Sequence, residues 1–123
     1  MFKHLYTLLS FSLIFFSCTN SENAKLVVGE WHASEWLIGG QPSNLQTEST
    51  GFKFTDKGEY TFVYGAKTET GTYKVENDML FTTPKGEQEI MVKIYNVTQD
   101  SLVFDMNRGG QQERLTLLKF IPK

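Results

Sequence analysis

The chain has 123 residues, with 12 Lys/Arg against 14 Asp/Glu, and a formal net charge of −2. That length suits one ordinary domain, and a 40% hydrophobic, 14% aromatic composition can build a core, which argues against global disorder. The charge balance argues against a general nucleic-acid binder, because phosphate binding needs clustered Lys and Arg. A single cysteine excludes an internal disulfide framework and any Cys-x-x-Cys metal or redox motif.

The N-terminal residues have the pattern of an export signal. Lys3 supplies a positive charge, residues 5–16 form an apolar run, and Ser17 and Cys18 follow it. This run is too short for a transmembrane helix, which needs roughly 20 apolar residues. We therefore predict a signal peptide over residues 1–17.

The cysteine that follows this run, with a small residue before it and a polar stretch after it, resembles the cleavage site of a bacterial lipoprotein. The resemblance implies cleavage before Cys18, lipid attachment to it, and a location at the outer membrane of the cell envelope, on either face. Phe15 and Phe16 precede the site, and aromatic residues there are tolerated in some phyla, the Bacteroidetes especially. The alternative is an ordinary secreted protein, in which an unpaired thiol needs another explanation. Residues 18–25 are predicted to be the lipidated cysteine and a tether.

Residues 26–123 alternate short apolar runs with turn residues, and no window after residue 24 keeps the 3.6-residue spacing of a helix. The predicted strands cover residues 26–37, 51–55, 59–64, 68–75, 79–83, 88–97, 101–106 and 112–121. Nearly every connection is short, which makes consecutive strands antiparallel neighbours. We predict an all-β fold, an eight-stranded antiparallel up-and-down barrel, with a two-sheet sandwich as the alternative. The connection at residues 39–50 is long, and such loops at barrel mouths often gate or bind.

The first predicted strand opens with Gly29-Glu30-Trp31. A Gly-x-Trp at this place in an eight-stranded meander resembles the lipocalin hallmark, in which the tryptophan closes one end of the barrel. The chain is also similar to small lipocalin-like lipoproteins of Bacteroidetes, through the motifs at residues 52–60, 71–75 and 97–102. The resemblance covers residues 26–121 and implies a lipocalin-like barrel. Two basic residues are candidates to cross the tryptophan, Arg114 and Lys119.

Catalysis is not expected. General acid–base and nucleophilic chemistry need a titratable base beside a nucleophile or a substrate. Once the signal peptide is removed, His32 is the remaining histidine, and its strand parity is opposite to that of Trp31, so an inward Trp31 directs His32 outward. Several acidic residues lie mainly at predicted turns and not in one cluster: Asp56, Glu59, Asp78 and Asp100. We predict no enzymatic activity, no metal site and no cofactor.

Aromatic residues are the remaining functional signal. They pack the cores of small β-domains in any case. The functional interpretation is a cavity at the open end of the barrel, where tyrosine hydroxyls fix the polar group of a small apolar or amphipathic ligand. The candidate ligand-binding residues are Trp31, Phe54, Tyr60, Phe62, Tyr64, Tyr73 and Phe104.

Trp31 and Trp36 have opposite strand parity. Either a β-bulge lies between them or one of the two faces outward. An outward Trp36 beside Leu37 would form an exposed apolar patch, so both residues are candidate partner contacts. With the loop at residues 39–50 they support an alternative function, a protein-interaction or inhibitor module of the cell envelope.

One triplet suggests a covalent modification. Asp100-Ser101-Leu102 resembles the O-glycosylation triplet of Bacteroidetes, which consists of Asp, Ser or Thr, and an apolar residue. The same residues occupy a predicted turn. Ser101 is therefore a candidate glycosylation site.

Overall fold

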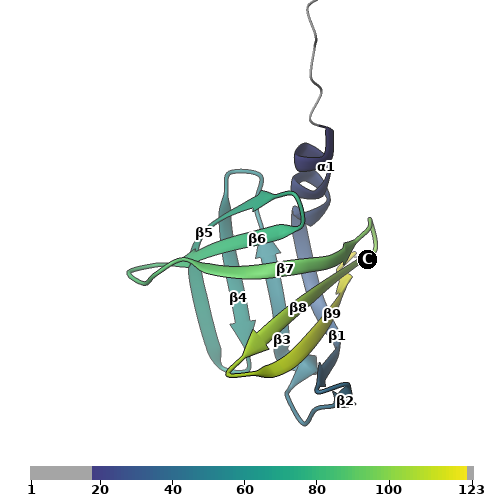
Figure 1. The fold of residues 1–123 in the computed structure, drawn as a ribbon. Helices are drawn as coiled ribbons and strands as arrows, with labels where there is room; N and C mark the ends of the chain where they lie inside the picture. The colour runs from purple at the N-terminus through teal and green to yellow at the C-terminus, as the bar shows by residue number, and fades with distance from the viewer. Residues whose placement is uncertain (1–17, 122–123) are drawn as a thin grey trace, which may run out of the picture.

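The computed structural model describes residues 18–121, with side chains described from residue 22 onward, as a short helix followed by a continuous antiparallel sheet (Figure 1). The predicted signal peptide lies outside the described residues. The elements are α1 (Cys18–Val27), β1 (Gly29–Ile38), β2 (Gln41–Pro42), the 3₁₀ turn η1 (Thr47–Ser49), β3 (Thr50–Phe54), β4 (Glu59–Tyr64), β5 (Lys67–Glu76), β6 (Met79–Pro84), β7 (Ile90–Val97), β8 (Ser101–Arg108) and β9 (Gln111–Lys119).

The sheet closes on itself. Its strand order is β2-β1-β3-β4-β5-β6-β7-β8-β9, and β1 also pairs with β9. The predicted strands are all present, and β2 is a two-residue addition to the far end of β1 within the predicted loop at residues 39–50. The up-and-down barrel is therefore confirmed, and the sandwich alternative is wrong.

The helix α1 replaces the predicted tether. The strand pattern placed a tether over residues 18–25 and began the first strand at residue 26, whereas the helix continues to Val27 and β1 begins at Gly29. The helix covers one end of the barrel, and we call this the closed end. Val27 is fully buried there, and Asn23 Nδ2 donates a hydrogen bond of 2.8 Å to the backbone carbonyl of Asn77 in the β5–β6 turn.

A β-bulge in β1 places both tryptophans inside the barrel. The register between β1 and β9 shifts between Ala33 and Glu35, which adds one residue and reverses the strand parity. Trp31 is fully buried and Trp36 is 4% exposed. The bulge alternative is confirmed. The outward Trp36 is wrong, and with Leu37 half-buried the predicted exposed patch does not form.

The Gly-x-Trp motif seals the closed end. Trp31 Nε1 donates a 2.8 Å hydrogen bond to the carbonyl of Val27. Lys119 Nζ lies 4.6 Å from the centre of the Trp31 ring and donates a 2.7 Å hydrogen bond to the carbonyl of Val28. Gly29 has φ of +137°, a backbone conformation that L side chains rarely adopt, so this position favours glycine. Lys119, and not the alternative Arg114, is the basic residue that crosses the tryptophan.

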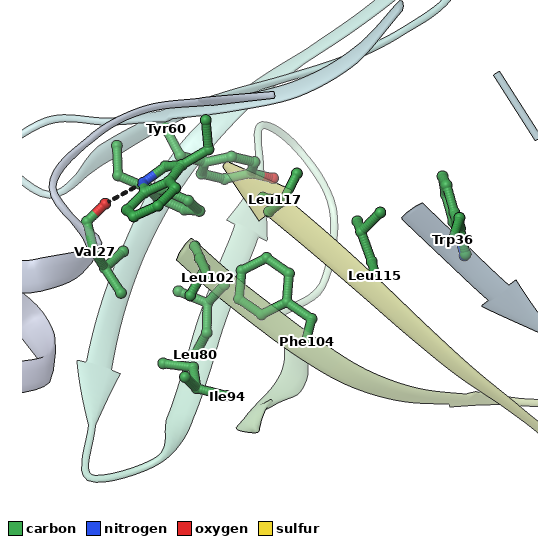
Figure 2. Close-up of a cluster of buried hydrophobic side chains, with 11 residues drawn as sticks. Val27, Trp36, Tyr60, Leu80, Ile94, Leu102, Phe104, Leu115 and Leu117 are labelled. Atoms are coloured by element: carbon green, nitrogen blue, oxygen red, sulfur yellow. Dashed lines mark hydrogen bonds between the residues drawn. The ribbon is translucent and has the colours of Figure 1, made fainter. Parts of the chain in front are cut away.

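The core runs along the barrel axis from the closed end toward Trp36 (Figure 2). It draws on α1 and on every long strand except β5, whose inward positions include Gly71 and the half-buried Tyr73. The buried apolar side chains are Val27, Trp31, Trp36, Phe54, Tyr60, Leu80, Ile94, Leu102, Phe104, Leu115 and Leu117.

Candidate functional site

A cavity of about 640 Å³ occupies the end of the barrel opposite α1, which we call the open end. Its walls are mainly aromatic and aliphatic, with a few charged and polar groups. The volume lies within the range of roughly 300–1,000 Å³ typical of small-molecule sites. The lining residues are Trp36, Phe52, Tyr60, Phe62, Glu69, Leu80, Thr82, Ile90, Met91, Val92, Phe104, Asp105, Met106, Asn107, Arg108 and Leu115.

The barrel wall is open beside this cavity. The ladder between β7 and β8 runs from Val97 paired with Leu102 to Lys93 paired with Asp105, and beyond that pair the two strands diverge (Figure 1). Residues 90–92 of β7 and 106–108 of β8 do not pair with each other, although they pair with β6 and β9, and they line the cavity from the two sides of this gap. The cavity is therefore reached from solvent through the wall as well as from the end.

Trp36 is hydrogen-bonded to an ion pair at the open end. Its Nε1 donates a 2.9 Å hydrogen bond to Glu113 Oε1, and Arg108 Nε lies 3.2 Å from Glu113 Oε2. Glu113 is only 5% exposed, and burial of a carboxylate is costly unless it is paired and hydrogen-bonded, as it is here. The Arg108 guanidinium lies 5.8 Å from the centre of the Trp36 ring and is mostly exposed. Arg108 therefore neutralises a buried carboxylate at the rim of the cavity.

A second polar pair lies on the wall formed by β4 and β5. The Tyr60 hydroxyl donates a 2.8 Å hydrogen bond to Glu69 Oε2. Burial raises the pKa of the Tyr60 hydroxyl above its ordinary value of 10.0, and the hydrogen bond to Glu69 raises it further. The hydroxyl therefore keeps its proton at neutral pH and remains a donor to the carboxylate.

The structure divides the predicted ligand-binding residues between the two ends. Tyr60, Phe62 and Phe104 line the cavity. Tyr64 lines an adjoining depression of about 590 Å³ that shares Phe62 and Glu69 with the cavity. These residues lie where the sequence placed a ligand.

The other predicted ligand residues belong to the closed half. Trp31 is sealed under α1, and the rings of Phe54 and Tyr73 pack edge to face with centroids 4.9 Å apart. The Tyr73 hydroxyl donates to the backbone carbonyl of Thr55, and burial raises the pKa of this hydroxyl. The structure therefore places these three residues in the packed half beneath α1 and not on the cavity, and a role for them in ligand binding stays a prediction.

Several cavity residues were missed from the sequence. Phe52 shares the inward parity of Phe54, so alternation could have found it. Glu69 alternates with Tyr73 along β5 in the same way, but its charge suggested an outward position. The remaining missed residues are Leu80, Thr82, Ile90, Met91, Val92, Asp105, Met106, Asn107, Arg108 and Leu115, while Trp36 was assigned to a partner contact.

His32 points outward, as its parity predicted. Its side chain is 55% exposed, stacks on Phe120 with ring centroids 4.8 Å apart, and lies 3.4 Å from Glu30. Within the described part of the chain, no group of three or more His, Cys, Asp or Glu residues could hold a metal ion. No helix of that part is long and apolar enough to cross a membrane. Glycosylation of Ser101, whose Oγ lies 3.1 Å from Thr98 Oγ1, stays a prediction.

A closed antiparallel barrel with an internal cavity defines the class of protein. Residues 27–104 match the family model described as a lipocalin-like domain. This match covers more than half of the chain, from the last residue of α1 into β8, so the protein belongs to the lipocalin-like family. A search of curated proteins found no match.

Proposed function

We propose that this protein is a lipid-anchored, non-catalytic member of the family at the outer membrane, which binds a small apolar or amphipathic ligand in its barrel. The cavity at the open end is the observation that carries the binding function. Its aromatic and aliphatic walls surround a few placed polar groups, which is the usual composition of a small-molecule site. The opening between β7 and β8 gives such a ligand access.

The anchor proposal rests on the N-terminal sequence, and the helix α1 gives it a geometry. Cys18 is the first residue of α1, and ten helical residues span about 15 Å. An acyl group on Cys18 would hold the barrel through this helix, with the closed end toward the membrane. The open end of the barrel, which lies opposite α1 in Figure 1, would then face away from the lipid surface, and the cavity lies at that end.

Binding of a neutral fluorescent probe, N-phenyl-1-naphthylamine, tests the binding function. The measurement uses the exported full chain with Cys18→Ala, so that no acyl chain competes for the probe. Met106→Trp fills the cavity and should weaken probe binding about tenfold or more, whereas Lys93→Trp adds the same bulk at an exposed position of β7. Equal affinity in the two variants, or no probe binding by the parent chain, would contradict the proposal.

Membrane fractionation with mass spectrometry of the exported protein tests the anchor. Cys18→Ala should remove the acyl mass and release the protein from the membrane fraction, whereas Thr19→Ala, one residue further on, should leave both unchanged. Membrane partitioning that persists in Cys18→Ala would count against lipid attachment at this residue.

A further inference from the structure

One charged group that faces the cavity has no counter-ion. Glu69 lies on the inward side of β5, half-buried, and its hydrogen-bond partner is the Tyr60 hydroxyl. Among the described residues, no Lys, Arg or His nitrogen lies within the 4.0 Å of an ion pair with Glu69. A carboxylate that is partly removed from water and has no cation beside it lacks a compensating charge. A bound cation would stabilise it.

The other charges around the cavity are already paired. Arg108 forms its ion pair with Glu113. Asp105 accepts hydrogen bonds of 2.7 Å and 3.2 Å from Arg114. Glu69 therefore supplies the uncompensated charge of the cavity lining, and that charge is negative.

The rim next to Glu69 carries charges of both signs. Lys67, Lys85 and Glu87 line the adjoining depression, and all three are exposed. Water and salt screen exposed charges more strongly than the carboxylate inside the barrel wall. These exposed residues therefore compensate the charge of Glu69 less than a direct ion pair would.

Aromatic rings line the cavity next to Glu69. Phe62 is the direct cross-strand partner of Glu69 in the β4–β5 ladder, and Phe52 stacks on Phe62 with ring centroids 4.5 Å apart. Aromatic faces attract a cation and disfavour a second anion. A carboxylate beside aromatic rings is thus suited to a positively charged head group with an apolar tail.

We propose that Glu69 selects the ligand, which is a cationic amphiphile whose protonated amine binds the Glu69 carboxylate beside Phe62. The alkyl or aryl part of the ligand lies along Phe52, Phe104 and Leu115, deeper in the cavity. The Tyr60 hydroxyl holds the carboxylate in place from the other side. This inference rests on the proposed binding function, because it names the ligand class of the same cavity.

Three ligands of equal chain length test the inference: octylamine, octan-1-ol and octanoate. Each displaces N-phenyl-1-naphthylamine from the same Cys18→Ala chain at neutral pH, where octylamine is protonated. The expected result is that octylamine binds about tenfold more tightly than octanol, with octanoate the weakest of the three. Glu69→Gln should reduce the preference for the amine over the alcohol to less than about twofold. Glu76→Gln, an exposed position on the outer face of β5, should keep it.

Tyr60→Phe is a second variant, because it keeps the carboxylate and removes its hydrogen-bond donor. This variant should retain the preference for the amine. Loss of that preference would overturn the assignment of selectivity to the charge of Glu69. A preference for octanoate, or an unchanged preference in Glu69→Gln, would also overturn the inference while the cavity remained a binding site. Failure of the probe itself to bind would instead remove the proposed function. Circular dichroism of each variant confirms that the barrel is folded.

Discussion

The two ends of the barrel use their tryptophans differently. At the closed end, Trp31 Nε1 donates to a backbone carbonyl, and Lys119 also binds a backbone carbonyl beneath α1. At the open end, Trp36 Nε1 donates to the side chain of Glu113, which a mostly exposed Arg108 neutralises. Backbone partners are fixed by the fold, whereas side-chain partners can rearrange around a ligand. The same strand therefore supplies a structural tryptophan at one end and part of the cavity wall at the other.

The largest expected effect is a difference in the stability lost when each tryptophan is replaced by alanine. Trp31→Ala should lower the free energy of unfolding by about 3–5 kcal/mol, because it empties a fully packed position. Trp36→Ala should lower it by about 1–3 kcal/mol, because its ring already borders a cavity. Urea denaturation of both variants measures the difference. A larger loss at Trp36 would contradict the division into a packed end and an open end.

A smaller effect is expected from the lysine that seals the closed end. Lys119→Met keeps the apolar stem but loses the cation over Trp31 and the hydrogen bond to Val28, so the free energy of unfolding should fall by about 1–2 kcal/mol. Lys74→Met is the matched control, since its ammonium lies 5.1 Å from the Phe81 ring on the exposed face. In the control, the free energy of unfolding measured by urea denaturation should change by less than about 0.5 kcal/mol. Equal losses would mean that Lys119 does not seal this end.

The smallest effect appears only at alkaline pH. Burial raises the pKa of Tyr60 and Tyr73 above the ordinary value of 10.0, so above that pH the folded state binds more protons than the unfolded state. The free energy of unfolding should therefore fall as pH rises through this range, by at most about 1.4 kcal/mol per pH unit for each tyrosine. Tyr60→Phe should remove more of this slope than Tyr73→Phe, because Glu69 adds to the effect of burial at Tyr60. Urea titrations at pH 8 to 11 measure it, and an unchanged slope in Tyr60→Phe would contradict the assignment.

The strands could be predicted because each has one face buried, and burial on one face imposes apolar alternation. The bulge in β1 could be inferred as one of two alternatives from the parity of Trp31 and Trp36. The helix α1 could not, because its apolar residues are few and, among its side chains described from residue 22 onward, only Val27 is fully buried. The free energy that fixes this helix comes from its docking on the finished barrel, which local periodicity does not report.

The candidate site was predictable only in part. Alternation identified inward aromatic residues, but the distinction between the sealed Phe54 and Tyr73 and the cavity-lining Phe62 depends on α1. Glu69 and Glu113 also have inward parity, yet a charged residue in an inward position contradicts the pattern used to find strands. Such contradictions mark positions where function competes with packing.

The divergence of β7 and β8 allows local exposure of backbone amides along the gap without unfolding of the whole protein. Backbone amides that face the gap along residues 90–92 and 106–108 have no ladder partner across it in the described structure, whereas residues 93–94 and 96–97 pair with residues 102–105. Amides without such partners exchange hydrogen with water through local fluctuations, and paired amides exchange only when the ladder opens. We therefore expect the amides along this gap to exchange faster than those of the sealed end, which hydrogen exchange would measure.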